Sequence, residues 1–152
     1  MDDSQLQLNN QICFPIYSVS KLITKAYKPY LDEMGITYPQ YLVLMVLWEN
    51  DNLSVNQITE KLLLNTNTLS PLLKRMEKMD IIQRTRSTED ERSVIIQLTE
   101  KGNLLKEIAK PIPDNLLKTL LSEEINLDEV LQLKETLNQW ITILTQNKDN
   151  LK

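Results

Sequence analysis

Apolar residues recur at three- and four-residue steps along most of the chain, which is the spacing of one face of an α-helix. This pattern predicts a first helix over about 11–30, and Gly35 is expected to terminate it because glycine favours helix ends. A second predicted helix, over about 38–49, follows a capping box at Thr37 and is apolar nearly all round. A helix without a polar face is typical of a domain centre, so we expect 38–49 to form the core.

Two short helices joined by a polar turn are predicted next. A second capping box at Ser54 starts a helix that runs to about 63, and the polar turn at 65–67 leads into a helix that ends at about 79. Pro71 requires this helix to start close to Thr66–Thr68, because proline lacks the N–H that a helix interior needs. Its inward-facing stripe is expected to be Leu69, Leu72, Leu73 and Met76.

The pattern then changes to short β-branched runs at 81–86 and 93–98, which flank a charged stretch at 87–92. This arrangement predicts a β-hairpin with a long polar tip. Thr99 is expected to cap a further helix that Pro111 and Pro113 interrupt, and a last helix is predicted over about 126–147. The predicted fold class is therefore mainly α with a small β-wing.

The residue types that are missing narrow the possible chemistry. The chain of 152 residues contains no histidine, one cysteine and two glycines. These counts exclude Ser-His-Asp and Cys-His catalysis, a cysteine-cluster zinc site and a glycine-rich phosphate loop, so we expect no metal, no cofactor and no enzymatic activity. No apolar run of about 18 residues exists, so no membrane partner is expected. The acidic, polar start of the chain favours a cytoplasmic protein.

The order of the central elements indicates DNA binding. Two short helices with a tight turn, followed by a two-stranded hairpin, form a winged helix-turn-helix, whose second helix enters the major groove. The net charge is −4, but residues 53–106 hold nine Lys/Arg against seven Asp/Glu, which permits a local nucleic-acid surface. Candidate DNA-binding residues are Thr66, Asn67, Thr68, Ser70, Lys74 and Arg75 in the second helix and Arg84, Arg86 and Arg92 in the hairpin. Each of these residues, taken alone, is equally well explained as a helix cap or a solvated charge. The prediction of DNA binding therefore depends on their order and spacing along the chain.

Three segments of this region form a family signature. They are Ile36-Thr37-Tyr38-Pro39-Gln40-Tyr41, then Thr68-Leu69-Ser70-Pro71-Leu72-Leu73-Lys74-Arg75-Met76-Glu77, then Asp90-Glu91-Arg92. With them, the stretch 36–102 closely resembles the MarR family of transcriptional regulators. Gln11-Ile12-Cys13-Phe14-Pro15-Ile16-Tyr17 is similar to the signature of its one-cysteine branch, which contains organic-hydroperoxide repressors and MgrA/SarZ-type global regulators.

The resemblance implies a homodimer that binds an inverted-repeat operator in double-stranded DNA. Residues 1–35 and 100–152 would form the helical dimerisation region, and residues 36–99 the winged helix-turn-helix region that binds DNA. In the hairpin tip, Arg92 would reach the minor groove and Asp90 would orient its guanidinium. Independently of the resemblance, the apolar stripe along 127–144 indicates that this helix packs against a partner.

The same resemblance matches Cys13 with a peroxide-sensing cysteine. Tyr27 and Tyr38 match two tyrosines that hydrogen-bond the thiolate from the other subunit, and Tyr17 matches a tyrosine one turn beyond the cysteine. A thiol reacts with peroxide as the thiolate, and a helix that starts near Gln11 would favour that charge. Oxidation would give a sulfenic acid, followed by a mixed disulfide with a low-molecular-weight thiol, overoxidation or reduction. The alternative is that Cys13 is an inert small hydrophobe.

Two positions depart from the family pattern. Pro15 follows the cysteine by two residues and removes a backbone donor where the family carries an ordinary helix former. The family's Asp-Ser/Thr-Gly turn is replaced by 65–67, Asn-Thr-Asn, where we expect an asparagine to adopt the left-handed backbone in place of glycine. We therefore expect the fold to be kept and the operator preference to differ.

These observations predict a redox-sensing transcriptional repressor that leaves its operator when organic hydroperoxides or other oxidants oxidise Cys13. One alternative within the family is a regulator whose cleft binds a phenolic ligand, with an incidental cysteine. From another class, a thiol peroxidase is disfavoured because no arginine stands near Cys13 in the sequence and the chain has no resolving cysteine. A winged protein-interaction module that does not bind DNA is the third alternative.

Overall fold

A computed structural model describes residues 3–90 and 92–149 of the chain. It contains two compact units, Met1–Ile112 and Pro113–Lys152. The expected dimerisation region is thus divided between them, with 1–35 and 100–112 in the first unit and 113–152 in the second. None of the helices within the described residues combines the length and hydropathy that a membrane span needs.

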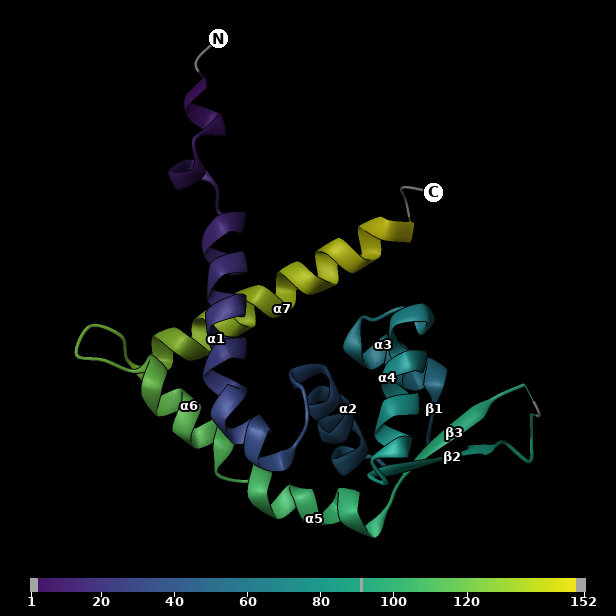
Figure 1. Cartoon of the computed structure of the whole chain (residues 1–152). Helices are drawn as coiled ribbons and strands as arrows, with labels where there is room; N and C mark the ends of the chain where they lie inside the picture. The colour runs from purple at the N-terminus through teal and green to yellow at the C-terminus, as the bar shows by residue number, and fades with distance from the viewer. Residues whose placement is uncertain (1–2, 91, 150–152) are drawn as a thin grey trace. The chain divides into compact units, whose positions relative to one another are not determined.

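The first unit contains most of the elements (Figure 1). It begins with two 3-10 turns, η1 (Asp3–Leu6) and η2 (Leu8–Asn10), followed by α1 (Cys13–Met34) and α2 (Tyr38–Glu49). The central elements are β1 (Leu53–Ser54), α3 (Val55–Leu62), α4 (Thr66–Lys78), β2 (Ile82–Arg86), β3 (Val94–Leu98) and α5 (Glu100–Ala109). The last two helices are α6 (Ile112–Leu120) and α7 (Leu127–Asp149). The expected mainly α fold with a β-wing is confirmed.

Helix α2 is the centre of the core, as its all-apolar pattern predicted. The Thr37 N–H donates to Gln40 Oε1 at 2.9 Å, which is one half of the expected capping box. Five of its apolar side chains are buried: Tyr41, Val43, Leu44, Val46 and Leu47. Both predicted ends of the helix are confirmed.

Helix α1 is longer than predicted, because it continues through Pro29 to Met34. Pro29 lacks the N–H that would bind a carbonyl one turn earlier. Beyond it, however, Leu31 and Met34 are 4% and 7% exposed, and burying such side chains stabilises by about 1.5–3 kcal/mol each. Packing therefore outweighs the lost hydrogen bond, and the helix ends at Gly35, whose φ is 68°.

The turn between α3 and α4 differs from the expected one. Asn65 has an extended backbone and caps α4, and Asn67 lies within the first turn of that helix. The left-handed residue is Leu63, with φ 54°, so the expectation for the asparagines is wrong. Pro71 is the sixth residue of α4, which begins within the predicted Thr66–Thr68 window although the proline lies inside the helix.

The hairpin is part of a three-stranded antiparallel sheet with the order β1-β3-β2. Strands β2 and β3 pair from Ile82 opposite Leu98 to Arg86 opposite Val94, as the hairpin prediction requires. The third strand, β1, was not predicted, because two residues are too short to show an alternating pattern. We refer to residues 82–98 as the wing.

A close contact joins α5 to the root of the wing. The Thr99 hydroxyl accepts the Gly102 N–H at 3.1 Å, which confirms the predicted cap. Trp48 Nε1 of α2 donates to the Gly102 carbonyl at 3.0 Å. A Cβ at position 102 would lie 2.1 Å from the Ile81 carbonyl oxygen, so only glycine fits there.

In the second unit, the cap of α7 also follows the prediction. The Asn126 N–H donates to Glu129 Oε2 at 2.8 Å, and the Glu129 N–H donates to Asn126 Oδ1 at 3.1 Å. Helix α7 carries a series of large apolar side chains that are 38% to 65% exposed: Leu127, Leu131, Leu133, Trp140, Ile141, Ile143 and Leu144. A helix with that much exposed apolar surface is typical of an interface.

Candidate nucleic-acid interface and thiol site

The first turn of α4 presents polar side chains to solvent. Thr66, Asn67 and Thr68 are exposed, and Ser70 is half-buried. Asn65 Oδ1 accepts both the backbone N–H and the hydroxyl of Thr68, each at 2.9 Å. Thr68 is therefore part of the helix cap, and Thr66 and Asn67 are the side chains at the solvent end of the helix.

The opposite face of α4 fixes its orientation in the unit. The predicted stripe of Leu69, Leu72, Leu73 and Met76 is confirmed, since each side chain is at most 4% exposed. Lys74 and Arg75 are exposed further along the helix. The amphipathic pattern thus turns the polar and cationic side chains of α4 outward.

The tip of the wing and the start of α4 line the same hollow. Thr66 and Ser70 line a hollow of about 330 Å³ together with Asp90 and Arg92 of the wing. Val55 and Asn56, at the start of α3, also line this hollow and were not among the predicted residues. Proximity to Thr66 depends on the helix-turn-helix angle, so no sequence spacing could have identified Asn56.

Asp90 and Arg92 are joined through the backbone. Asp90 Oδ1 accepts the Arg92 N–H at 3.0 Å, which fixes the turn at the wing tip. The expected contact between the carboxylate and the Arg92 guanidinium is not among the hydrogen bonds of the described residues. Glu91, the middle residue of the signature, lies outside those residues.

The two arginines of β2 have different surroundings. Arg86 is exposed near the wing tip. Arg84 Nε donates to Glu77 Oε2 of α4 at 2.8 Å, and the two side chains are 28% and 38% exposed. Arg84 was predicted to bind DNA, but in this structure its guanidinium is paired within the chain.

The thiol lies at the start of α1. Cys13 is the first residue of the helix and is exposed, as the position near Gln11 predicted. Tyr17, one turn later, is 61% exposed, and Lys21 Nζ lies 5.1 Å from the centre of its ring. An exposed thiol at a helix N-terminus is open to oxidants and feels the positive end of the helix dipole. Within the single chain the thiol is therefore not buried.

Tyr27 and Tyr38 lie together, but away from the thiol. Their ring centres are 4.9 Å apart, and Tyr41 is 5.6 Å from Tyr27 and 6.1 Å from Trp48. Burial raises the pKa of Tyr27 to about 12, with a further contribution from the two neighbouring tyrosines. Burial also raises the pKa of Tyr38. Both phenols therefore keep their protons near neutral pH and can act as hydrogen-bond donors.

The distance between the two groups follows from the helix itself. Cys13 and Tyr27 are separated by 14 residues of α1, which at 1.5 Å per residue is about 21 Å. The predicted sensor residues are thus not brought together within one chain. They form two separate pairs, with Cys13 and Tyr17 at the start of α1 and Tyr27 and Tyr38 near its other end.

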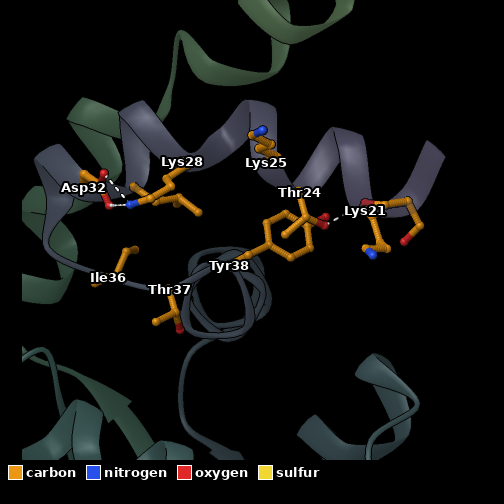
Figure 2. Close-up of a pocket in the computed structure, with 10 residues that line it drawn as sticks. Lys21, Thr24, Lys25, Lys28, Asp32, Ile36, Thr37 and Tyr38 are labelled. Atoms are coloured by element: carbon orange, nitrogen blue, oxygen red, sulfur yellow. Dashed lines mark hydrogen bonds and ion pairs between the residues drawn. The ribbon is translucent and has the colours of Figure 1, made fainter. Parts of the chain in front are cut away.

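A cavity of about 580 Å³ lies between α1 and the connection to α2 (Figure 2). Its lining includes Lys21, Lys25 and Lys28 of α1, together with Tyr38, whose ring points from α2 toward α1. Lys28 Nζ is held by both carboxylate oxygens of Asp32 at 2.7 and 2.8 Å. Sequence reasoning missed this cavity, although the three- and four-residue spacing of the lysines places them on one helix face.

Comparisons with known proteins show which family this sequence resembles. The family model for the transcriptional regulator SarA/Rot matches residues 25–108. The organic hydroperoxide resistance transcriptional regulator of Bacillus subtilis is 49% identical over 93% of this chain and 94% of its own length. The regulator MgrA of Staphylococcus aureus is 34% identical over 95% of this chain and 97% of its own length.

Solved structures extend the likeness to the fold. Reduced AbfR bound to DNA has a TM-score of 0.77 and overoxidised AbfR bound to DNA one of 0.74. Both are 38% identical to this chain and cover 95% of it and 99% of their own chains; AbfR is from Staphylococcus epidermidis. The chain therefore belongs to the SarA/Rot transcriptional regulators, in the organic-hydroperoxide branch of the MarR-type winged helix proteins, and not to a family of enzymes.

Proposed function

We propose that this protein is a homodimeric, redox-sensing repressor that binds an inverted-repeat operator. Helix α4 would enter the major groove, where Thr66, Asn67 and Ser70 meet base edges and Lys74 and Arg75 meet phosphates or guanine. On each side Arg92, with Arg86, would reach the minor groove from the wing. The observation that carries this proposal is the hollow that brings the exposed start of α4 and the wing tip together.

The dimer would be formed by 1–35 and 100–152. The exposed apolar side chains of α7 support an interface there, and the first half of α1 adds Phe14, Ile16, Val19 and Leu22, which are 38% to 64% exposed. A symmetric pair places the two α4 helices about 34–36 Å apart, one turn of DNA. Any change that alters this spacing releases the operator, because both heads must fit one duplex.

Cys13 would be the sensor. The thiolate attacks the terminal oxygen of an organic hydroperoxide, the O–O bond breaks and Cys13 becomes a sulfenic acid. The departing alkoxide takes up a proton from solvent and leaves as an alcohol. Tyr27 and Tyr38 of the second chain would donate hydrogen bonds to the thiolate, which accounts for the separation of about 21 Å between Cys13 and Tyr27 in the same chain. The sulfenic acid then condenses with a low-molecular-weight thiol: an S–S bond forms, the S–O bond breaks and water leaves. The bulk of this mixed disulfide at the dimer interface would shift the reading heads.

The test is a titration of a DNA duplex that the reduced protein selects from a random-sequence pool. We expect peroxide, or diamide with a small thiol, to weaken binding of the wild type by at least about tenfold, or about 1.4 kcal/mol. Cys13→Ser has the same size and should bind but not respond, and mass spectrometry should find the modification on Cys13. Release of the Cys13→Ser protein by peroxide would refute the redox proposal.

The cavity beside α1 supports a second candidate, a regulator that responds to a small ligand. Its volume of about 580 Å³ suits a small aromatic acid, and the lysines could hold the acid group. In that case salicylate would release the duplex from Cys13→Ser as readily as from the wild type. Release that requires Cys13 favours the redox function instead.

A further inference from the structure

The root of the wing is tied to α4 by one ion pair. Glu77 lies in the last turn of α4 and Arg84 is the third residue of β2, so the pair joins two residues that are seven positions apart in the sequence. The Nε–Oε2 distance of 2.8 Å is that of a charge-assisted hydrogen bond. Partial burial of both side chains protects the pair from solvent and salt more than a fully exposed pair.

The chain reverses direction inside this loop. Asp80 adopts a left-handed backbone with φ 58°, and its N–H donates to the Glu77 carbonyl at 2.9 Å. The Ile81 N–H donates to the Met76 carbonyl at 3.2 Å. These hydrogen bonds fix the reversal at Asp80. The Glu77–Arg84 pair lies farther from the reversal, at the point where β2 leaves α4, and it therefore acts on the direction of β2.

We propose that Arg84 is a positioning residue, which sets the angle of the wing against α4, and that it does not contact the DNA backbone. This inference rests on the proposed DNA-binding function. It divides the cations of the wing into two roles. Arg86 and Arg92, which form no ion pair with any other described residue, remain available for DNA, whereas Arg84 determines where they are held.

The effect of a small change in angle is amplified along the hairpin. Arg84 pairs with Ile96, and Arg92 lies four residues beyond that level, which is about 13 Å of strand. A tilt of about 10° at the root therefore moves the tip by about 2 Å over that length. Hydrogen bonds to DNA tolerate only about 0.5 Å, so loss of the pair should weaken the contacts of the tip.

The charge of Glu77 distinguishes positioning from direct contact. If Arg84 bound a phosphate, Glu77 would be an unpaired anion close to the DNA backbone, and removing it would strengthen binding. If the pair sets the wing angle, removing either partner should weaken binding. The two interpretations therefore predict effects of opposite sign for Glu77→Ala.

The experiment is a double-mutant cycle with Glu77→Ala, Arg84→Ala and the double variant. Binding to the duplex selected by the reduced protein, and to a random duplex, is measured over a range of salt concentrations. We expect each single variant to lose about three- to tenfold in affinity for the selected duplex, and the double variant to lose no more than the worse single one. Affinity for the random duplex should fall less than affinity for the selected duplex, and the slope of log K against log salt should fall by clearly less than the value of about 0.9 for one phosphate contact.

Two control variants lie in the same wing. Arg86→Ala removes a cation that forms no ion pair with another described residue, and it should reduce the salt slope by about 0.9, the value for one neutralised phosphate beside the minor groove. Glu89→Ala removes an exposed carboxylate near the tip and should strengthen binding, opposite to Glu77→Ala. Thermal unfolding identifies any variant that fails to fold, and Glu77→Gln and Arg84→Gln, which keep more of the side chain, then replace it.

Some results would overturn the proposal. Unchanged or tighter binding by folded Glu77→Ala would do so, as would a salt slope for Arg84→Ala that falls like that of Arg86→Ala. Equal losses on the selected and random duplexes would indicate a merely structural role and also refute it. If the wild type selects no duplex at all, that result refutes the proposed function, and the inference with it. The results above, by contrast, refute only the role of Arg84.

Discussion

The close approach of α5 to the wing root makes Gly102→Ala a sharp test of the structure. The new Cβ would lie 2.1 Å from the Ile81 carbonyl oxygen and 3.1 Å from Leu98 Cδ2. Ordinary contact begins at about 3.4 Å, so the carbonyl would have to move by about 1.3 Å, which is 3.4 minus 2.1. That carbonyl accepts the Thr99 N–H at 3.2 Å, and the movement would disrupt this bond as well.

The change in the free energy of unfolding is the balance of two destabilising contributions and one stabilising contribution. Overpacking of a close contact costs about 1–3 kcal/mol, and a lost hydrogen bond adds about 1 kcal/mol. Alanine in place of glycine in a helix returns up to about 1 kcal/mol. We therefore expect Gly102→Ala to lower the free energy of unfolding by about 2–3 kcal/mol, or the melting temperature by roughly 4–12 °C.

The assay is urea unfolding followed by circular dichroism at one protein concentration. Gly35→Ala is the matched control, because Gly35 has φ 68° and a Cβ added there would meet no atom within 4 Å, so its only cost is a left-handed alanine of about 1 kcal/mol. Gly102→Ala should therefore be the more destabilised variant. A Gly102→Ala protein as stable as the wild type, or more so, would refute the close contact between α5 and Ile81.

Two further substitutions address strain and ionisation. Leu63→Gly should raise the free energy of unfolding by roughly 0.5–1 kcal/mol, because Leu63 ends α3 with a left-handed φ of 54° that strains a residue other than glycine. Glu60→Gly, inside the same helix, is the control and should lower the free energy of unfolding by about 1 kcal/mol. Urea unfolding measures both variants, and a destabilised Leu63→Gly protein would contradict the strain at Leu63. The folded pKa of Tyr27 is about 12 against 10.0 for an ordinary tyrosine, so the unfolded chain loses its proton first and wild-type stability should fall as pH rises from 10 to 12. Tyr27→Phe should reduce this fall in urea titrations across that range, and an equally steep fall in the variant would show that Tyr27 does not contribute.

Local signals in the sequence were sufficient for most of the fold. Capping pairs such as Ser54–Gln57 and Asn126–Glu129 identify helix starts because both partners lie within one turn. The stripe on α4 identifies its buried face for the same reason. By contrast, the continuation of α1 beyond Pro29 depends on burial of Leu31 and Met34 by other parts of the chain, which no local pattern reports.

The candidate site divides in the same way. Residue types and their order identify the exposed start of α4 and the thiol at the start of α1, since both depend on helix position. The partner of Arg84 could not be predicted, because it depends on how β2 leaves the turn at Asp80. Asn56 joins the hollow only through the angle between α3 and α4.

The length of α1 between Cys13 and Tyr27 has a consequence for genetics. If the thiol of one chain is completed by the phenols of another, each sensing centre draws on two polypeptides. Cys13→Ser and Tyr27→Phe, each deficient when expressed alone, would then complement one another when co-expressed, because the mixed pair contains one intact centre and one that lacks both groups. Intragenic complementation of this kind would show genetically that the cysteine and the tyrosine of one sensing centre come from different chains.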